Sequence, residues 1–222
     1  MEDLEFDLLS TDGKVRRVSI SGTAIRDENG NFVMSRSVVY DITERKAVEL
    51  RIGHMATHDP LTGLPNRTLF NDRLTQVVSR LSRKAENVAM FILDLDEFKP
   101  INDKYGHEVG DTVLVAFSRR LQSCVREIDT VARLGGDEFG LILADVGDGS
   151  GVIQVAEKIL DLTSQSITVG SGVIVRLGVS IGIAISGPSG RNVDTLVRDA
   201  DRAMYASKAQ GRNRFTISSN EH

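Results

Sequence analysis

The sequence predicts a mixed α/β protein of the α+β type, in which helices flank a central sheet. Three observations support this class. Residues 88–93 form a short run of apolar residues only, as expected for a strand that is covered on both faces. Gly135 and Gly136 separate two apolar segments, a pattern typical of a β-hairpin. Between these strands, residues 112–125 repeat apolar residues at helical spacing, which predicts an amphipathic helix.

The composition is that of an ordinary soluble protein and excludes several classes. Of the 222 residues, 41% are hydrophobic and 26% are charged, as in most globular proteins. The net charge of −4 argues against a nucleic-acid-binding protein. The single cysteine, Cys124, excludes an internal disulfide and fits a reducing compartment, and its spacing places it on a buried helix face. No run approaches the ~18 apolar residues of a membrane span, so we expect a cytoplasmic protein whose membrane segment, if any, lies upstream in a longer parent.

Residues 1–43 are expected to form strands. Residues 17–24 alternate between polar and apolar or small side chains, and residues 27–31 have the composition of a hairpin loop. Residues 32–40 are the expected return strand, and residues 6–9 a third strand. Two or three strands with one apolar face cannot form a stable unit alone, so this segment is expected to be part of a larger domain.

The exit of that segment, Asp41-Ile42-Thr43-Glu44-Arg45, resembles the end of a PAS sensor domain. We therefore expect residues 1–43 to be the C-terminal part of a PAS domain, and the chain to be a fragment of a longer protein with an upstream sensor. Residues 44–57 are expected to be a helical linker. Apolar residues fall near one face of this helix, over about two heptads, so a solvated connector and a two-helix stalk both remain open.

The main domain is expected to mix helices and strands. A loop at residues 59–67 leads into a helix that ends near residue 83. Residues 173–183 alternate as a long strand or strand pair, and the other face of this segment carries small residues that would let a helix or ligand pack closely. The remaining expected elements are strands at residues 88–94, 130–133, 139–143 and 214–217, and helices at residues 112–125, 152–163 and 196–209.

Two pairs of acidic residues lie where strands end. Asp94 and Asp96 end the apolar run, and Asp137 and Glu138 follow the Gly-Gly turn. Glycine lets another molecule approach the backbone closely. Carboxylates that face one another at a strand end can hold Mg²⁺, a hard ion that prefers oxygen ligands, against the phosphates of a nucleotide. An ordinary polar turn would be the better interpretation if the Gly-Gly-Asp motif stood alone.

The motif Gly135-Gly136-Asp137-Glu138-Phe139 resembles the signature of GGDEF domains, the diguanylate cyclases. Further stretches are similar to that family in the same order, at residues 58–67, 94–111, 126–129 and 208–213. The resemblance covers residues 56–215 and implies a catalytic domain at residues 58–218, with the mostly antiparallel sheet of nucleotidyl cyclases and polymerase palms. It also implies condensation of two GTP molecules into cyclic di-GMP and two pyrophosphates, two Mg²⁺ or Mn²⁺ ions per active site, and a homodimer as the active form.

The resemblance assigns the metal ions to Asp94 and Asp137, with help from the backbone carbonyl of Leu95. It favours Asp137 as the acceptor of the proton from the attacking 3′-hydroxyl group. Glu138 is a second candidate for that role, and the sequence does not separate the two acids.

The segment after Asp94 is expected to be a loop that carries substrate contacts. The resemblance assigns these contacts to Phe98, Lys99, Asn102, His107 and Asp111. The loop would offer backbone N–H groups to the phosphates, while Asn102 and Asp111 would read the guanine edge. The structural alternative for Asp111 is an N-cap of a helix that starts at residue 112, and both roles can hold together.

Two further charged motifs complete the expected sites. Lys208 and Arg212 would hold the triphosphate, although they also fit an ordinary cationic helix end. Arg126 and Asp129 form the Arg-x-x-Asp motif that the resemblance assigns to inhibition by the product, whereas taken alone they are a surface ion pair of little energetic value.

Two other functions are alternatives to an active diguanylate cyclase. A degenerate domain could bind GTP or cyclic di-GMP as a regulatory module, but such relatives usually lack the hairpin acids that are present here. An enzyme that makes a mixed guanine–adenine dinucleotide is disfavoured because Asp111 is retained.

Overall fold

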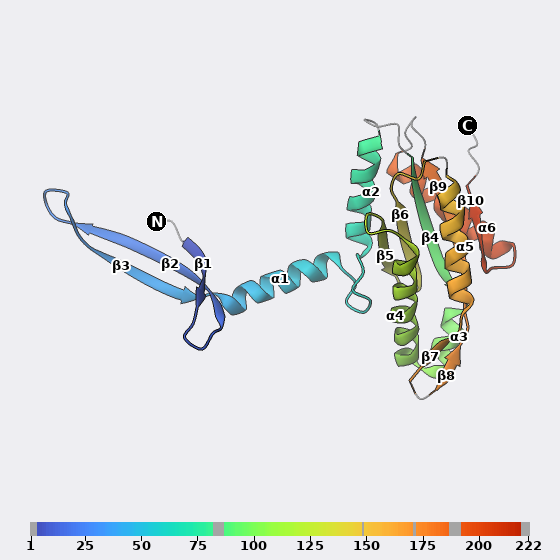
Figure 1. Cartoon of the computed structure of the whole chain (residues 1–222), viewed down its shortest axis with the longest axis horizontal. Helices are drawn as coiled ribbons and strands as arrows, with labels where there is room; N and C mark the ends of the chain where they lie inside the picture. The colour runs from blue at the N-terminus through green and yellow to red at the C-terminus, as the bar shows by residue number, and fades with distance from the viewer. Residues whose placement is uncertain (1–3, 82–86, 148, 171, 187–191, 219–222) are drawn as a thin grey trace. The chain divides into compact units, whose positions relative to one another are not determined.

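The computed structural model describes residues 4–81, 87–147, 149–170, 172–186 and 192–218. The chain divides into two compact units, Met1–Ala56 and Thr57–His222, each of which is described by itself (Figure 1).

The first unit is a three-stranded antiparallel sheet followed by one helix. The strands β1 (Leu4–Leu9), β2 (Val15–Arg26) and β3 (Phe32–Asp41) pair in the order β1-β2-β3, as the alternating pattern predicts. The carboxylate of Asp27 closes the β2–β3 turn, because it accepts the backbone N–H groups of Asn29 and Asn31.

The apolar side chains of the first unit are largely exposed. Phe32, Val33 and Leu9 are 60%, 55% and 71% exposed, so this sheet alone does not bury its apolar residues. The helix α1 (Thr43–Thr57) occupies the predicted linker. Its apolar residues Val48 and Ile52 are also exposed, which leaves the connector and stalk interpretations both open.

The second unit is built on a five-stranded sheet of order β10-β9-β4-β6-β5. The parallel pair β9–β10 lies at one edge and all other pairs are antiparallel, so the expected mostly antiparallel sheet is confirmed. The strands are β4 (Val88–Asp96), β5 (Thr130–Gly135), β6 (Glu138–Leu143), β9 (Gly178–Ser186) and β10 (Arg214–Ile217).

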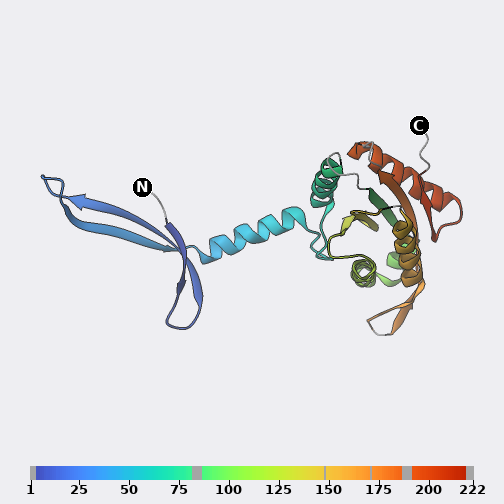
Figure 2. The same cartoon turned by 45° about the horizontal axis from the view of Figure 1, so that its top comes forward.

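Helices cover both faces of this sheet (Figure 2). The side chains of β4 alternate between two apolar clusters, which explains its wholly apolar sequence. One cluster includes α4 (His107–Cys124) and α5 (Ser150–Ser164), and the other includes α2 (Arg67–Leu81) and α6 (Val193–Ala209). Cys124 is buried, as predicted.

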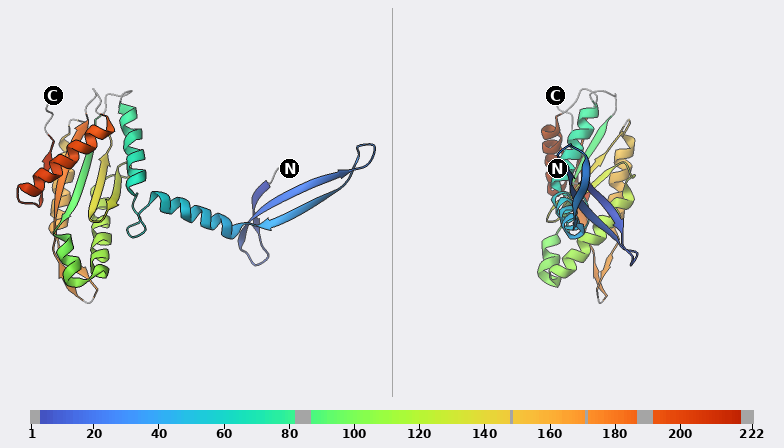
Figure 3. Two further views of the ribbon diagram at one scale, coloured as in Figure 1. Left: turned by 180° about the vertical axis from the view of Figure 1, so that it is seen from behind. Right: turned by 90° about the vertical axis from the view of Figure 1, so that its left-hand side faces the viewer.

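The small residues of β9 let α6 pack directly on the sheet. A Cβ atom at Gly182 would overlap backbone atoms of Ala200 and Met204 in α6. Figure 3 shows α6 lying across β9 and β4. The predicted close approach of a helix to this face is therefore confirmed, and it brings the end of α6 to the end of β4.

Three boundaries differ from the prediction. The loop expected after Asp94 is a helix, α3 (Phe98–Tyr105), which buries Phe98 and Ile101, and its proline lies in the first turn, where no backbone N–H is needed. The helix α4 begins at His107 instead of residue 112, because Gly106, with φ of 85°, ends α3 and starts α4 directly.

The predicted strand at residues 173–183 also divides in two. β8 (Val173–Val175) pairs with β7 (Ile167–Val169) in a separate two-stranded sheet, which the sequence analysis missed, and β9 joins the main sheet. Residues 82–83, the predicted end of α2, lie outside the described residues.

Candidate active site

Asp94 lies at the end of the central strand, among charged groups of both signs. In the sheet it pairs with Glu138 on one side and Ser180 on the other. Its side chain is 14% exposed, and Lys208 of α6 places its Nζ 2.8 Å from Asp94 Oδ2. Burial raises the pKa of Asp94, and repulsion from Asp137 and Asp96 adds to this effect, whereas Lys208 partly offsets it. The carboxylate is therefore desolvated and incompletely compensated, with Lys208 as its cationic partner and two acids nearby.

The Gly-Gly turn brings the hairpin acids to the same strand end. Gly135 and Gly136 have φ angles of 142° and 56°, which few other residues would adopt. The backbone N–H of Leu95 donates to the carbonyl of Asp137 at 3.3 Å and ties the turn to β4. Among the residues that the structure describes, the Asp137 carboxylate has no hydrogen-bond or ion-pair partner.

Glu138 is held differently from Asp137. Arg67 donates from Nη2 to Glu138 Oε2 at 3.1 Å and from Nε to the carbonyl of Leu134 at 3.0 Å. The two adjacent acids thus differ in availability, since Glu138 already has a cationic partner.

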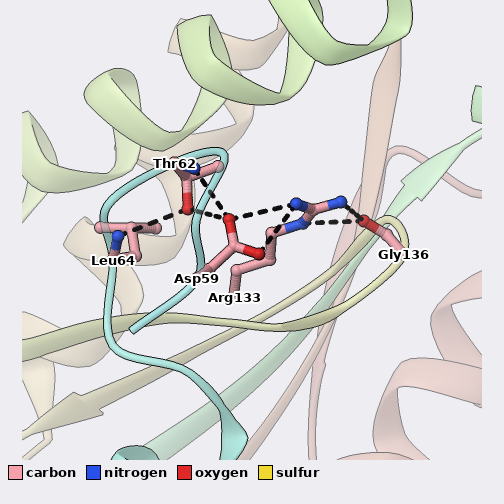
Figure 4. A network of polar contacts seen from close by, with 5 residues as sticks. All are labelled: Asp59, Thr62, Leu64, Arg133 and Gly136. Carbon is pink, nitrogen blue, oxygen red and sulfur yellow. Dashed lines mark hydrogen bonds and ion pairs between the residues drawn. The ribbon is translucent and has the colours of Figure 1, made fainter. Parts of the chain in front are cut away.

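A partly buried ion pair fixes the turn from the other side (Figure 4). Arg133 donates from Nη1 to both carboxylate oxygens of Asp59, at 3.1 and 3.0 Å, and from Nε and Nη2 to the carbonyl of Gly136, at 3.0 and 2.8 Å. Asp59 also accepts the backbone N–H and the hydroxyl group of Thr62, at 2.8 and 2.7 Å. The sequence predicts a loop at residues 59–67 and does not predict this ion pair. Two charged residues in the sequence could have suggested the pair: Asp59 in the loop, and Arg133, which lies two residues before Gly135.

The expected base-contacting residues lie on two adjoining helices. Asn102 is in α3 and contacts Gly110 of α4, the residue before Asp111. Asp111 is exposed inside α4, so its interpretation as a helix N-cap is wrong. His107 is the first residue of α4.

Phe98 and Lys99 open α3, whose first backbone N–H groups have no partner within the helix. The Phe98 side chain is buried in the core, whereas Lys99 is exposed. Any phosphate contact from Phe98 would therefore come from its backbone.

The turn after α6 carries Arg212 and is anchored by Asp96. Arg212 and Asn213 both have positive φ angles, 61° and 44°, which are unusual for residues other than glycine. The buried carboxylate of Asp96 accepts the backbone N–H of Asn213 at 2.9 Å and the hydroxyl group of Ser180 at 2.6 Å. Asp96 thus links β4, β9 and this turn, a role that the sequence analysis did not assign.

Arg126 and Asp129 lie away from these acids, at the opposite end of the β5–β6 hairpin. The guanidinium of Arg126 donates to both oxygens of Asp129 and to the carbonyl of Ala144. Asp129 also accepts the backbone N–H groups of Arg126 and Ala144, and its side chain is 2% exposed. A cavity of about 370 Å³ adjoins this pair, with Lys158 of α5 in its wall.

The acids at the strand end suit a hard cation. Asp94 and Asp137 offer carboxylate oxygens in a site where negative charges repel one another, and such a donor set fits Mg²⁺ or Mn²⁺. Within the described ranges, no cluster of three or more His, Cys, Asp or Glu residues is placed to hold a metal. Any remaining ligands would have to come from the backbone, from water or from substrate phosphates.

Comparisons with known proteins agree with these observations. The family model described as diguanylate cyclase, GGDEF domain, matches residues 56–214. Diguanylate cyclase TpbB of Pseudomonas aeruginosa is 41% identical over 161 residues, which are 72% of this chain and 37% of that protein. The chain thus spans little more than a third of this curated relative.

Two solved structures have the same fold. The isolated GGDEF domain of TpbB from Pseudomonas aeruginosa matches with a TM-score of 0.68 and 38% identity, over 73% of this chain and 94% of that one. The coiled coil and GGDEF domain of DgcB from Caulobacter crescentus, in complex with c-di-GMP, matches with a TM-score of 0.71 and 30% identity, over 78% and 92% of the two chains.

In the part of the chain that the structure describes, no helix has the length and apolar character of a membrane span. The family model covers well over half of the 222 residues, from the Asp59 loop to the start of β10. The chain belongs to the GGDEF-domain diguanylate cyclase family.

Proposed function

We propose that this chain condenses two GTP molecules into cyclic di-GMP and two pyrophosphates. The observation that carries the proposal is the strand end at which Asp94, with its raised pKa, lies 2.8 Å from Lys208 and beside the unpartnered Asp137. Carboxylates and a cation brought together in this way suit phosphoryl transfer, in which charge develops on phosphate oxygens. The name of the relative TpbB supports the same activity.

Asp94, Asp137 and the carbonyl of Leu95 would hold the Mg²⁺ or Mn²⁺ ions. When bound, these ions would polarise the attacking 3′-hydroxyl group and offset charge on the triphosphate. Lys208 would leave Asp94 for the triphosphate, where Arg212 would join it. The first backbone N–H groups of α3, at Phe98 and Lys99, would bind the phosphates.

The new bond joins the ribose 3′-oxygen of one GTP to the α-phosphorus of the other, and the bond to pyrophosphate breaks. The proton of the 3′-hydroxyl group would pass to Asp137, because Glu138 is already paired with Arg67 at 3.1 Å. The Asp111 carboxylate would accept the N1–H and exocyclic amine groups of guanine, and the Asn102 amide would supply one donor and one acceptor to the same base. His107 would lie at the border of the base site.

Each copy of the chain carries a single set of these acids, whereas the product contains two guanylyl groups. Catalysis would therefore need two GTP-loaded domains that face each other across a two-fold axis. In a longer parent protein, residues 1–43 would belong to a PAS sensor domain and residues 44–57 would transmit its state to the catalytic domain at residues 58–218.

Arg126 and Asp129 would bind cyclic di-GMP as an inhibitor. The adjoining cavity, whose wall contains Lys158 and Asp145, has a volume suited to part of a nucleotide. Because Asp129 is enclosed by its present partners, Arg126 would have to turn toward the ligand before Asp129 could read a guanine edge.

Incubation of the purified chain with Mg²⁺ and GTP tests the proposal. Cyclic di-GMP should form at a specific activity that rises with protein concentration, and Asp137→Ala should abolish it. Asp161→Ala, which changes an exposed acid on α5, is the matched control. Binding of GTP or cyclic di-GMP without turnover would instead identify a regulatory module.

Arg126→Ala should keep the activity and lose inhibition by added product.

A further inference from the structure

We propose that Gly110 is a positioning residue for guanine recognition, because it leaves the space in which the Asn102 amide lies. This inference rests on the proposed function and names a residue that it does not include. Gly110 is buried inside α4, where glycine is less favourable than alanine. The presence of glycine here would be explained if the binding site, and not the helix, needs a residue without a side chain.

The packing around Gly110 shows what that requirement is. A Cβ atom built at this position would overlap Oδ1 of Asn102, and it would lie 2.9 Å from Cγ of the same residue and 3.2 Å from Cζ of Phe98. The Asn102 amide therefore occupies the place that any other side chain at position 110 would fill.

The Asn102 amide is held by this space and not by hydrogen bonds at its oxygen. Oδ1 of Asn102 is one of the buried side-chain atoms that have no hydrogen-bond partner among the described residues. A buried acceptor without a partner destabilises the protein and calls for a reason. A ligand with N–H donors next to Asp111, such as a guanine base, would supply the missing partner after a small rotation of the amide.

The backbone around the two residues is hydrogen-bonded, so an added Cβ at position 110 would chiefly displace the Asn102 amide, with a smaller shift of the Phe98 ring. The N–H of Gly106 donates to the carbonyl of Asn102 at 2.8 Å, and the N–H of Gly110 donates to the carbonyl of Gly106 at 3.3 Å. These bonds join the end of α3 to the first turn of α4. An added methyl group at position 110 would therefore displace the end of the Asn102 side chain and leave the fold in place.

The test compares Gly110→Ala with Asn102→Ala and with the double variant. Gly110→Ala should raise the GTP concentration needed for half-maximal activity by about tenfold, the loss expected for one hydrogen bond to the base. It should also lower the preference for GTP over ATP, while kcat changes less. The double variant should be no worse than Asn102→Ala alone, because both changes remove the same contact.

Gly53→Ala is the matched control, since Gly53 is also helical and an added Cβ would meet nothing within 4 Å. It should leave GTP selectivity unchanged. Thermal unfolding separates a site effect from a folding effect. In the Asn102→Ala background, Gly110→Ala should raise the melting temperature, because the methyl group fills the vacated space and alanine favours the helix.

Normal GTP selectivity in Gly110→Ala would overturn the inference, and so would fully additive losses in the double variant. If Asn102→Ala alone has no effect on GTP binding, both the base contact and the role of Gly110 are wrong. If the chain binds GTP but makes no cyclic di-GMP, weaker GTP binding by Gly110→Ala would still support the inference, although the proposed catalytic activity would fail.

Discussion

Two carboxylates near the Gly-Gly turn are similarly buried and yet have pKa values shifted in opposite directions. The side chains of Asp59 and Asp94 are 16% and 14% exposed, and each is paired with one cation. Burial alone would raise the pKa of Asp59, but hydrogen bonds from Thr62 and Arg133 together lower it below its ordinary value. The pKa of Asp94 is raised, chiefly by burial, despite its contact with Lys208.

The difference lies in how completely each carboxylate is satisfied. Asp59 accepts four hydrogen bonds, two from Arg133 and two from Thr62, and faces a planar guanidinium that matches both oxygens. Asp94 has one ammonium partner and two acidic neighbours, Asp137 and Asp96. A fully satisfied buried carboxylate stabilises the turn, whereas an incompletely satisfied one is available for another cation. Burial and charge alone do not separate structural acids from functional ones.

The largest expected effect follows replacement of the incompletely satisfied acid. Asp94→Asn should lower cyclic di-GMP synthesis by about a thousandfold, because a carboxylate ligand at the site of developing charge is lost. The free energy of unfolding should stay the same or rise slightly, since the cost of desolvating the carboxylate is removed and repulsion with Asp137 and Asp96 is relieved. A turnover assay and thermal unfolding of the same preparation measure both quantities.

Asp161→Asn on α5 controls for loss of a charge elsewhere. A loss of stability in Asp94→Asn that accounts for its loss of activity would contradict the comparison, because Asp94 would then be a structural acid like Asp59.

The second effect is on stability. Asp59→Ala should lower the free energy of unfolding by about 3 kcal/mol, because it leaves the partly buried guanidinium of Arg133 without its anionic partner. For a unit of this size, that loss corresponds to a decrease of roughly 6–12 °C in the melting temperature. The activity should also fall, since the carbonyl of Gly136 loses its fixed donor. If Asp59→Ala unfolds at the wild-type temperature, the pair does not hold the turn.

Much of this fold could be predicted because its signals are local. Local sequence patterns were enough to predict the buried strand β4, the Gly-Gly hairpin and the face of β9 on which a helix packs. Both ends of β10 were also predicted correctly. The helix α3 was missed because it contains Pro100, and its amphipathic face is only two residues, Phe98 and Ile101. A short helix of this kind becomes stable only through tertiary packing.

The parts of the candidate site in which acidic residues lie at strand ends could be predicted. The parts that form where segments distant in the sequence meet could not. The two acid pairs could be proposed as a site from their positions, and the family resemblance singled out Asp94 and Asp137. The Asp59–Arg133 pair joins residues 74 positions apart in the sequence, and Asp96 reaches Asn213 across 117 positions. Neither partner has a local pattern that points to the other, so only the folded chain reveals them.

The two acids should also respond oppositely to pH. Asp59, with its pKa lowered from the ordinary value of 3.8, contributes stability above that value, and this contribution is lost as pH falls through its folded-state pKa. Asp94, with its pKa raised from 3.8, favours folding at low pH and loses this contribution as pH rises through its folded-state pKa.

Unfolding measured between pH 2.5 and 7 tests these signs. Any stability gained in Asp94→Asn relative to wild type should be largest at neutral pH and vanish in acid. The deficit of Asp59→Ala should instead shrink below pH 3.8. An Asp94→Asn difference that grows as the pH falls would show that the pKa of Asp94 is lowered and not raised.

The smallest effect is expected at the third ion pair of the turn. Arg67 and Glu138 are 59% and 40% exposed, so water and salt screen their attraction. Arg67→Ala should therefore lower the free energy of unfolding by no more than about 1 kcal/mol, and the difference from wild type should shrink as salt is raised. Glu138 would then be free of its cation. Urea unfolding at low and high salt measures this difference. If Arg67→Ala lowers the free energy of unfolding as much as Asp59→Ala does, exposure does not predict the strength of the ion pairs at this turn. The number of hydrogen bonds on each carboxylate would then be the wrong measure of its role.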